Sequence, residues 1–158
     1  MERGVLLAVA LQRYSDLTPR SLAARNMAAE LADYYKAPLI VLTAHVQLAL
    51  MPEGESTEEK LARFVSPLVE RGLQVESIVR EGSPRSVIPE VAREMNARVI
   101  VIGTHSKQGI LDTALGGTAK AVITSAPCRV ILVAATKEEA EKTRELIIPE
   151  YPFIFPYG

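Results

Sequence analysis

Five short apolar runs recur along the chain, separated by longer stretches of mixed polarity. Four of the runs are almost continuously apolar and rich in valine and isoleucine, a pattern typical of strands covered on both faces of a sheet. The third run alternates apolar and polar residues, which predicts a half-exposed edge strand. The five predicted strands are residues 5–11, 38–46, 73–79, 97–103 and 129–135.

The stretches between the runs carry apolar residues at helical spacing, and local signals mark where the helices begin. Thr18 precedes Pro19, a combination of N-cap and first-turn proline that starts a helix. Ser56 and Glu59 have the spacing of a capping box, and Ser83 is the expected cap of the next helix. The predicted helices are residues 19–35, 57–71, 84–96 and 117–125.

Strands and helices therefore alternate along one chain of 158 residues, a length that favours a single domain. This alternation predicts an α/β fold: an open, parallel, five-stranded sheet with helices on both faces and right-handed crossovers. Ligands in such folds bind beyond the carboxyl ends of the strands. The loop after the fourth predicted strand leaves that edge of the sheet, which makes it a candidate site.

Residues 136–158 form a C-terminal extension to the domain predicted over residues 1–135. A charged helix is expected to begin after Thr136, and a segment rich in proline and aromatic residues follows it over 147–158. An aromatic segment left in water would be an exposed apolar patch, so we expect it to pack. Its own domain, a partner subunit and a vacant ligand cleft are the alternatives, and stabilisation of a dimer is the simplest.

Charge and cysteine content narrow the classes of partner and compartment. The formal net charge is −1, and the basic residues are scattered, so nothing favours binding to nucleic acid. No run reaches the roughly 20 apolar residues that a membrane-spanning helix needs, and no membrane insertion is expected. Cys128 is the single cysteine, which excludes an intrachain disulfide and fits a cytoplasmic location. We expect it to be a structural thiol.

The candidate loop, GTHSKQGILDTALGGT, spans residues 103–118 and contains four glycines. It lacks the Gly-Lys-Ser/Thr end of a P-loop, and it does not have the position or spacing of a dinucleotide fingerprint. Gly116, Gly117 and Thr118 stand at the start of a predicted helix, where bare N–H groups and a hydroxyl suit an anion. A flexible connection is the alternative interpretation of the same residues.

The chain resembles the universal stress protein family over residues 4–135. The loop has the family's spacing, with Gly103 and Ser106 at its start and nine residues between Ser106 and Gly116. Ala-Pro-Cys over 126–128 follows as in the family. The His45–Val46 pair and residues 81–105 are also similar. The resemblance implies a sheet order of 3-2-1-4-5, adenine-nucleotide binding with Mg²⁺ when the ligand is ATP, and a homodimer formed through 129–135. The aromatic tail follows this strand, so we expect it to add to the same dimer.

Three positions depart from the pattern of the family members that bind ATP. Ala10 stands where they have an aspartate, Ser106 where they have a glycine, and Gly117 where they have serine or threonine. Thr118 follows one residue later and can supply a hydroxyl. The expected result is a degenerate site for ATP or AMP, or a site that binds no nucleotide at all. Its predicted residues are Val9, Ala10, Val46, Gly103, His105, Ser106, Gly109, Gly116, Gly117 and Thr118.

The residues suggest no catalytic machinery, since they provide no arrangement of nucleophile, base and oxyanion donors. A packing role at a strand end is expected for His45. The resemblance implies a non-catalytic regulatory protein of the stress response, with weak ATP hydrolysis left open. The alternative is a structural dimer that binds no nucleotide and acts through its dimer surface and aromatic tail.

Overall fold

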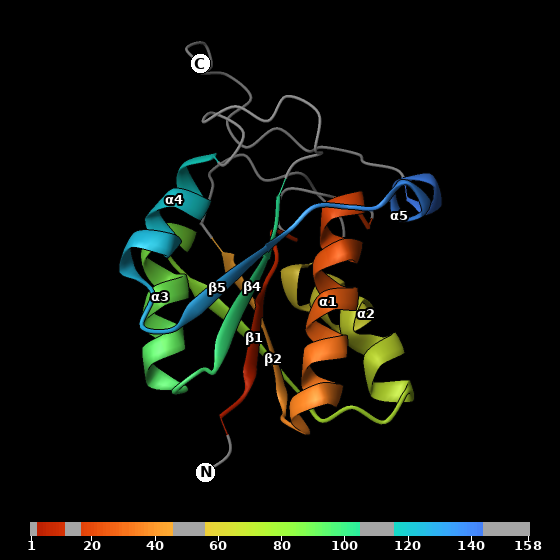
Figure 1. Cartoon of the computed structure of the whole chain (residues 1–158), viewed down its shortest axis with the longest axis horizontal. Coiled ribbons are helices and arrows are strands. Elements are labelled where there is room, and N and C mark those ends of the chain that lie inside the picture. Colours follow the sequence, from red (N-terminus) through yellow and green to blue (C-terminus); the bar gives the residue numbers. More distant parts are fainter. Residues whose placement is uncertain (1–2, 12–16, 46–55, 105–115, 144–158) are drawn as a thin grey trace.

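The computed structural model describes residues 3–11, 17–45, 56–104 and 116–143, which form a three-layer α/β fold (Figure 1). Strands and helices alternate along these residues as the pattern predicts. The strands are β1 (Val5–Ala8), β2 (Leu39–His45), β3 (Val75–Glu81), β4 (Val99–Gly103) and β5 (Arg129–Val133). The helices are α1 (Pro19–Tyr35), α2 (Thr57–Glu70), α3 (Pro84–Glu94), α4 (Gly116–Ser125) and α5 (Lys137–Lys142).

The sheet has the order β3-β2-β1-β4-β5, and every pair of neighbours is parallel. This confirms the order that the family resemblance implied. β1 is the central strand, and its four residues are buried because a strand covers each of its edges and helices cover both faces. β3 is an edge strand with half-exposed residues, as its alternating pattern predicts.

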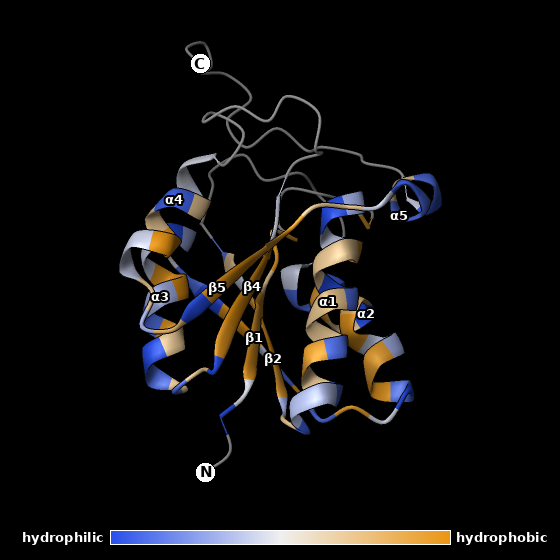
Figure 2. Cartoon of the chain, in the orientation of Figure 1, coloured by the Kyte–Doolittle hydropathy of each residue, from blue (hydrophilic) through white to orange (hydrophobic). Residues whose placement is uncertain are grey.

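Two layers of apolar contacts hold the helices on the sheet. Val5 and Leu7 of β1 pack with α1 and α2 on one face, whereas Leu6 packs with α3 and α4 on the other. Figure 1 shows α1 and α2 together on one side of the sheet and α3 and α4 on the opposite side. In Figure 2 the strands are mostly hydrophobic, and polar residues follow the outer faces of the helices.

Side-chain caps fix where three of the helices begin. Thr18 Oγ1 accepts from the Ser21 amide at 3.1 Å, and Ser56 Oγ accepts from the Glu59 amide at 3.1 Å. Both satisfy amides that a helix leaves unpaired at its start. Thr136 caps α5 in the same way. The prediction for Ser83 is wrong in one respect, because it occupies the N-cap position of α3 without a side-chain cap hydrogen bond.

The predicted strand ends were less accurate than the helix starts. β1 ends at Ala8 rather than residue 11, although Leu11 remains buried and donates its amide to Thr43 Oγ1. β3 runs two residues later than predicted, and β5 ends at Val133 rather than residue 135. For β1 the reason is that Val9 and Leu11 continue into the core beyond the stretch that pairs with the neighbouring strands.

The C-terminal extension begins with α5, which lies against α1. Asn26 Nδ2 donates to Glu139 Oε2 at 2.7 Å across this contact. The rest of the extension, including Tyr151, Phe153, Phe155 and Tyr157, lies outside the described residues. Among the described residues, no helix is both long and apolar enough to cross a membrane.

Candidate functional site

The carboxyl ends of β1 and β4 bring separate parts of the predicted site to one edge of the sheet. Ala8 pairs with Ile102, so Val9 and Ala10 leave the sheet beside Gly103. Ala10 is exposed at this edge, whereas Val9 is buried and belongs to the core. The position where nucleotide-binding relatives are expected to have aspartate is therefore accessible, and it carries only a methyl group.

Gly103 ends β4 in close contact with α1. A Cβ atom at this position would collide with the backbone carbonyl of Arg20 in the first turn of the helix. Backbone cannot move aside as a side chain can, so glycine is required here by the packing of β4 against α1. The amide of the next residue, Thr104, donates to the Val133 carbonyl at 2.8 Å and continues the contact with β5.

The start of α4 supplies the predicted anion-binding groups. Gly116 has a φ of +69°, a left-handed conformation that glycine adopts without steric cost. Gly117 is covered by the guanidinium group of Arg85, which a Cβ atom on Gly117 would strike. Thr118 follows and is half-buried. A helix start with its free amides, next to a guanidinium group, has a positive electrostatic potential.

Two cations at this edge were not identified from the sequence. Arg85 stands in the first turn of α3, and Lys60 in the first turn of α2 donates from Nζ to the Leu11 carbonyl at 3.3 Å. α2 and α3 both begin at the carboxyl edge of the sheet, as crossover helices do. A basic residue in the first turn of a crossover helix is the signal that could have found them.

His45 connects the end of β2 to the start of α2. Its Nδ1 lies 3.0 Å from Thr57 Oγ1, and Thr57 is buried. The contact agrees with the packing role expected for His45 at a strand end. Four other predicted site residues lie outside the described residues: Val46, His105, Ser106 and Gly109.

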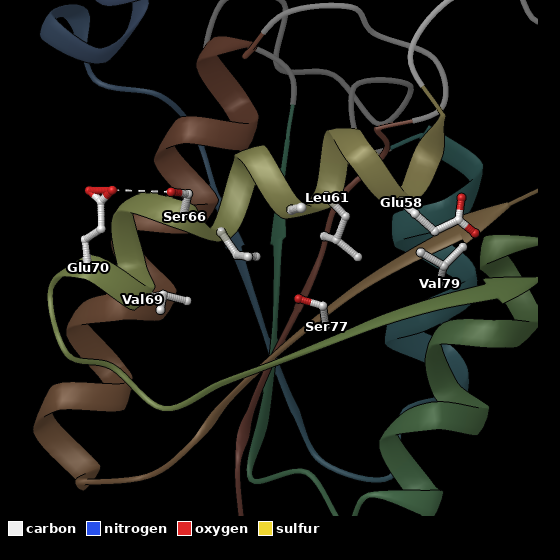
Figure 3. Close-up of a pocket in the computed structure, with 9 residues that line it drawn as sticks. Glu58, Leu61, Ser66, Val69, Glu70, Ser77 and Val79 are labelled. Atoms are coloured by element: carbon white, nitrogen blue, oxygen red, sulfur yellow. Dashed lines mark hydrogen bonds between the residues drawn. The ribbon is translucent and has the colours of Figure 1, made fainter.

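A separate cavity of about 620 Å³ opens between α2 and the edge strand β3 (Figure 3). Glu58 and Glu70 line it together with apolar residues such as Leu61 and Val79, and none of the described lining residues is basic. Two carboxylates oppose the binding of a phosphate group, so this cavity does not suit the ligand class that the carboxyl edge favours. Within the described ranges, no group of three His, Cys, Asp or Glu side chains could hold a metal ion.

The sheet order and the alternating helices define an open, parallel α/β protein, and comparison with known proteins specifies the family. The model of the universal stress protein family matches residues 15–134. The chain belongs to the universal stress protein family.

The sequence similarity to curated relatives covers part of this chain. A universal stress protein E homolog from Haemophilus influenzae is 39% identical over 61 residues, which are 39% of this chain and 20% of that protein. A universal stress protein from Methanocaldococcus jannaschii is 33% identical over 104 residues, which are 65% of this chain and 61% of that protein. The chain thus spans less than two thirds of the length of either relative.

Solved structures of the family have the same fold. A universal stress protein from Archaeoglobus fulgidus has a TM-score of 0.68 at 24% identity, covering 84% of this chain and 94% of that one. Another from Archaeoglobus fulgidus, in complex with dAMP, has a TM-score of 0.60 at 26% identity, covering 83% of this chain and 97% of that one. A family protein from Arabidopsis thaliana with AMP bound has a TM-score of 0.58 at 19% identity, and the match covers 87% of this chain and 94% of that one.

Proposed function

We propose that this chain is a non-catalytic regulatory protein whose carboxyl edge binds an adenine nucleotide, ATP or AMP, through a degenerate site. The observation that carries the proposal is the start of α4, where Gly116 and Gly117 are followed by Thr118 and Arg85 covers Gly117. The solved relatives with dAMP and AMP support the ligand class.

The residues at this edge fit a phosphate group. The first turn of α4 and the first turn of α3 contain no acidic residue, so no carboxylate there repels an anion. The amides of Gly116 and Gly117 and the hydroxyl of Thr118 would hold the phosphate, and Arg85 would add a positive charge. The adenosine part would lie near Ala10 and Val46, with the rest of the 103–118 loop completing the site.

The missing aspartate sets the expected affinity. A hydrogen bond to a charged group contributes about 1.5–3 kcal/mol, so its loss weakens binding by about ten- to a hundredfold. Ala10 is exposed and has room for a carboxylate. The site is therefore weak because it lacks an acceptor for the adenosine part, while its phosphate-binding groups remain.

The first test is to denature the purified protein and analyse the small molecules that it releases. The second is calorimetric titration with AMP, and with ATP in the presence of Mg²⁺. Thr118→Ala should weaken binding about tenfold or more, and Ala10→Asp should tighten it by a similar factor. The matched control is Thr124→Ala, at the other end of α4, whose hydroxyl donates to the Lys120 carbonyl within the same helix. Absence of released nucleotide and of binding heat up to millimolar ligand, for wild type and Ala10→Asp alike, would overturn it.

A homodimer through 129–135 is the second part of the proposal, because one edge of β5 has no strand beside it among the described residues. Val130, Ile131, Leu132 and Val133 are only half-buried, unlike the central strands. Nucleotide binding would then alter association rather than drive a reaction. If the site binds nothing, the dimer surface and the aromatic tail are what remains to act.

A further inference from the structure

A second cavity, of about 280 Å³, opens at the amino ends of the strands, the opposite edge of the sheet from the proposed nucleotide site. This edge lies near the N-terminus in Figure 1. Three arginines line the cavity: Arg3 before β1, Arg98 before β4, and Arg129 at the start of β5. Tyr35, at the end of α1, and Cys128 complete the polar lining, and no acidic residue is among the described residues of this lining.

The Arg98 side chain packs on the Tyr35 ring, and one of its N–H donors has no hydrogen-bond partner among the described residues. Its guanidinium group lies 4.4 Å from the centroid of the Tyr35 ring, a cation–π contact. Its Nε atom is buried and has no hydrogen-bond partner among the described residues. A buried donor without an acceptor is costly and uncommon in folded proteins. An acceptor supplied by a ligand would remove this cost.

The two other arginines add positive charge without a counter-charge. Arg3 is anchored by hydrogen bonds to the carbonyl oxygens of Asn96, at 3.3 Å, and Ala97, at 3.1 Å. Arg129 has no ion pair among the described residues, whereas elsewhere Arg71 pairs with Asp33 and Arg80 with Glu94. Within the part of the chain that the structure describes, the three guanidinium groups around this cavity therefore have no carboxylate partner, unlike Arg71 and Arg80.

We propose that this cavity is an anion site that binds a phosphate group, as inorganic phosphate or as the phosphate of a small monoester. Guanidinium groups donate paired N–H groups in a planar fork that matches phosphate oxygens. Pockets for drug-sized ligands measure about 300–1,000 Å³, so a cavity of 280 Å³ suits a smaller molecule. The site is separate from the 103–118 loop and does not depend on nucleotide binding there.

Cys128 gives this site a built-in reporter, because it lines the cavity and is the single cysteine of the chain. Burial raises the pKa of the Cys128 thiol, and the positive charge of Arg3 opposes this effect. A bound phosphate covers the thiol and offsets the charge of Arg3, and both effects slow reaction with an alkylating reagent.

The test measures the rate of Cys128 alkylation by neutral iodoacetamide at fixed pH and ionic strength. Inorganic phosphate and glycerol phosphate are the two probes, and chloride is the reference anion. At about ten times its dissociation constant, either probe should slow alkylation about tenfold by mass action. Greater protection by glycerol phosphate identifies a monoester as the better ligand, and greater protection by inorganic phosphate identifies the free ion.

Variants locate the protection. Arg98→Gln and Arg129→Gln should each abolish most of it, and Arg98→Lys should restore part, since it keeps the charge but loses the fork. Arg93→Gln is the matched control, because its guanidinium bonds the Ser125 carbonyl on α4. Arg129 is exposed at a strand start, so its variant should fold even if Arg98→Gln does not. Thr118→Ala, at the opposite edge, should leave protection unchanged.

Three results would overturn the proposal. The first is no protection by either probe at tens of millimolar, and the second is equal protection by chloride, which indicates screening alone. The third is protection by phosphate that persists in Arg98→Gln and Arg129→Gln. The same conclusion follows if protection of Cys128 rises with protein concentration in the absence of phosphate. In that last case a second copy of the chain, rather than a small anion, covers Cys128.

Discussion

At the scale of single residues, two glycines of the family loop have different physical roles. Gly103 contacts the backbone of α1, whereas Gly117 contacts the far end of the Arg85 side chain. A methyl group at Gly103 must therefore displace a helix, and the same group at Gly117 displaces only a flexible guanidinium. The loop glycines thus allow β4 to pack on α1 at one end and allow Arg85 to approach the start of α4 at the other.

This difference predicts the stability of two matched variants. Gly103→Ala should lower the free energy of unfolding by about 1–3 kcal/mol, the usual range for overpacking. Gly117→Ala should leave it within about 1 kcal/mol of wild type, since alanine also favours the helix. Urea denaturation of both proteins checks the prediction. Equal losses in the two variants would mean that Gly103 does not hold β4 against α1.

At the scale of elements, helix starts were predictable because their signals are local. Thr18, Ser56 and Thr136 each bond an amide three residues away, a contact that the sequence alone specifies. Strand ends depend on the partner strands, so the apolar run that ends at Leu11 could not show that pairing stops at Ala8. For the same reason the sequence located Gly116 and Gly117 but not Arg85, which reaches them from another helix.

The contact between α5 and α1 should depend on pH. Burial alone raises the pKa of Glu139, but hydrogen bonds from Thr136 and Asn26, with the charge of Lys142, outweigh it and hold the pKa below its ordinary value. The stabilisation is therefore complete above the ordinary glutamate range, near 4.3, and is lost as the pH falls through the lowered pKa. Because Glu139 is only half-buried and α5 contains no buried residue, we expect local opening of α5 rather than global unfolding.

Hydrogen exchange of the α5 amides between pH 7 and pH 3, corrected for intrinsic exchange, measures this opening. Asn26→Ala should raise exchange at pH 7 and weaken its pH dependence, because it removes one of the bonds that lower the pKa. Asn96→Ala, far from α5 in the turn after α3, is the control and should change neither. Protection of α5 that stays constant down to pH 3 would contradict the role of Glu139.

At the scale of the whole molecule, the two edge strands of the sheet, β3 and β5, differ in the polarity of their side chains. β3 carries Glu76, Ser77 and Glu81, and charged or polar residues on an edge strand oppose pairing with another chain. β5 has four consecutive apolar residues, Val130 to Val133, and its one charged residue, Arg129, stands at its start. Association of two copies should therefore use β5 and leave β3 free.

Light scattering with size-exclusion chromatography tests this asymmetry. The wild-type protein should have twice the 17.2 kDa mass of one chain. Leu132→Glu should shift it to the monomer mass, because a carboxylate in an apolar interface loses its hydration. Ser77→Glu on β3 is the control and should remain dimeric, with circular dichroism confirming that both variants fold. A monomeric wild-type protein at high concentration would contradict the dimer.

The two proposed ligand sites lie at opposite ends of the parallel strands and share no residue, so their effects on stability should add. A ligand at a hundred times its dissociation constant stabilises the folded state by about 2.7 kcal/mol, and effects at distant sites add to within about 0.3–0.5 kcal/mol. The free energy of unfolding, measured with AMP, with inorganic phosphate and with both, should show the sum. Arg98→Gln should remove the phosphate increment and keep that of AMP, while Thr118→Ala should do the reverse. Increments that fail to add would mean that both ligands compete for one edge, because a shared site can be filled only once.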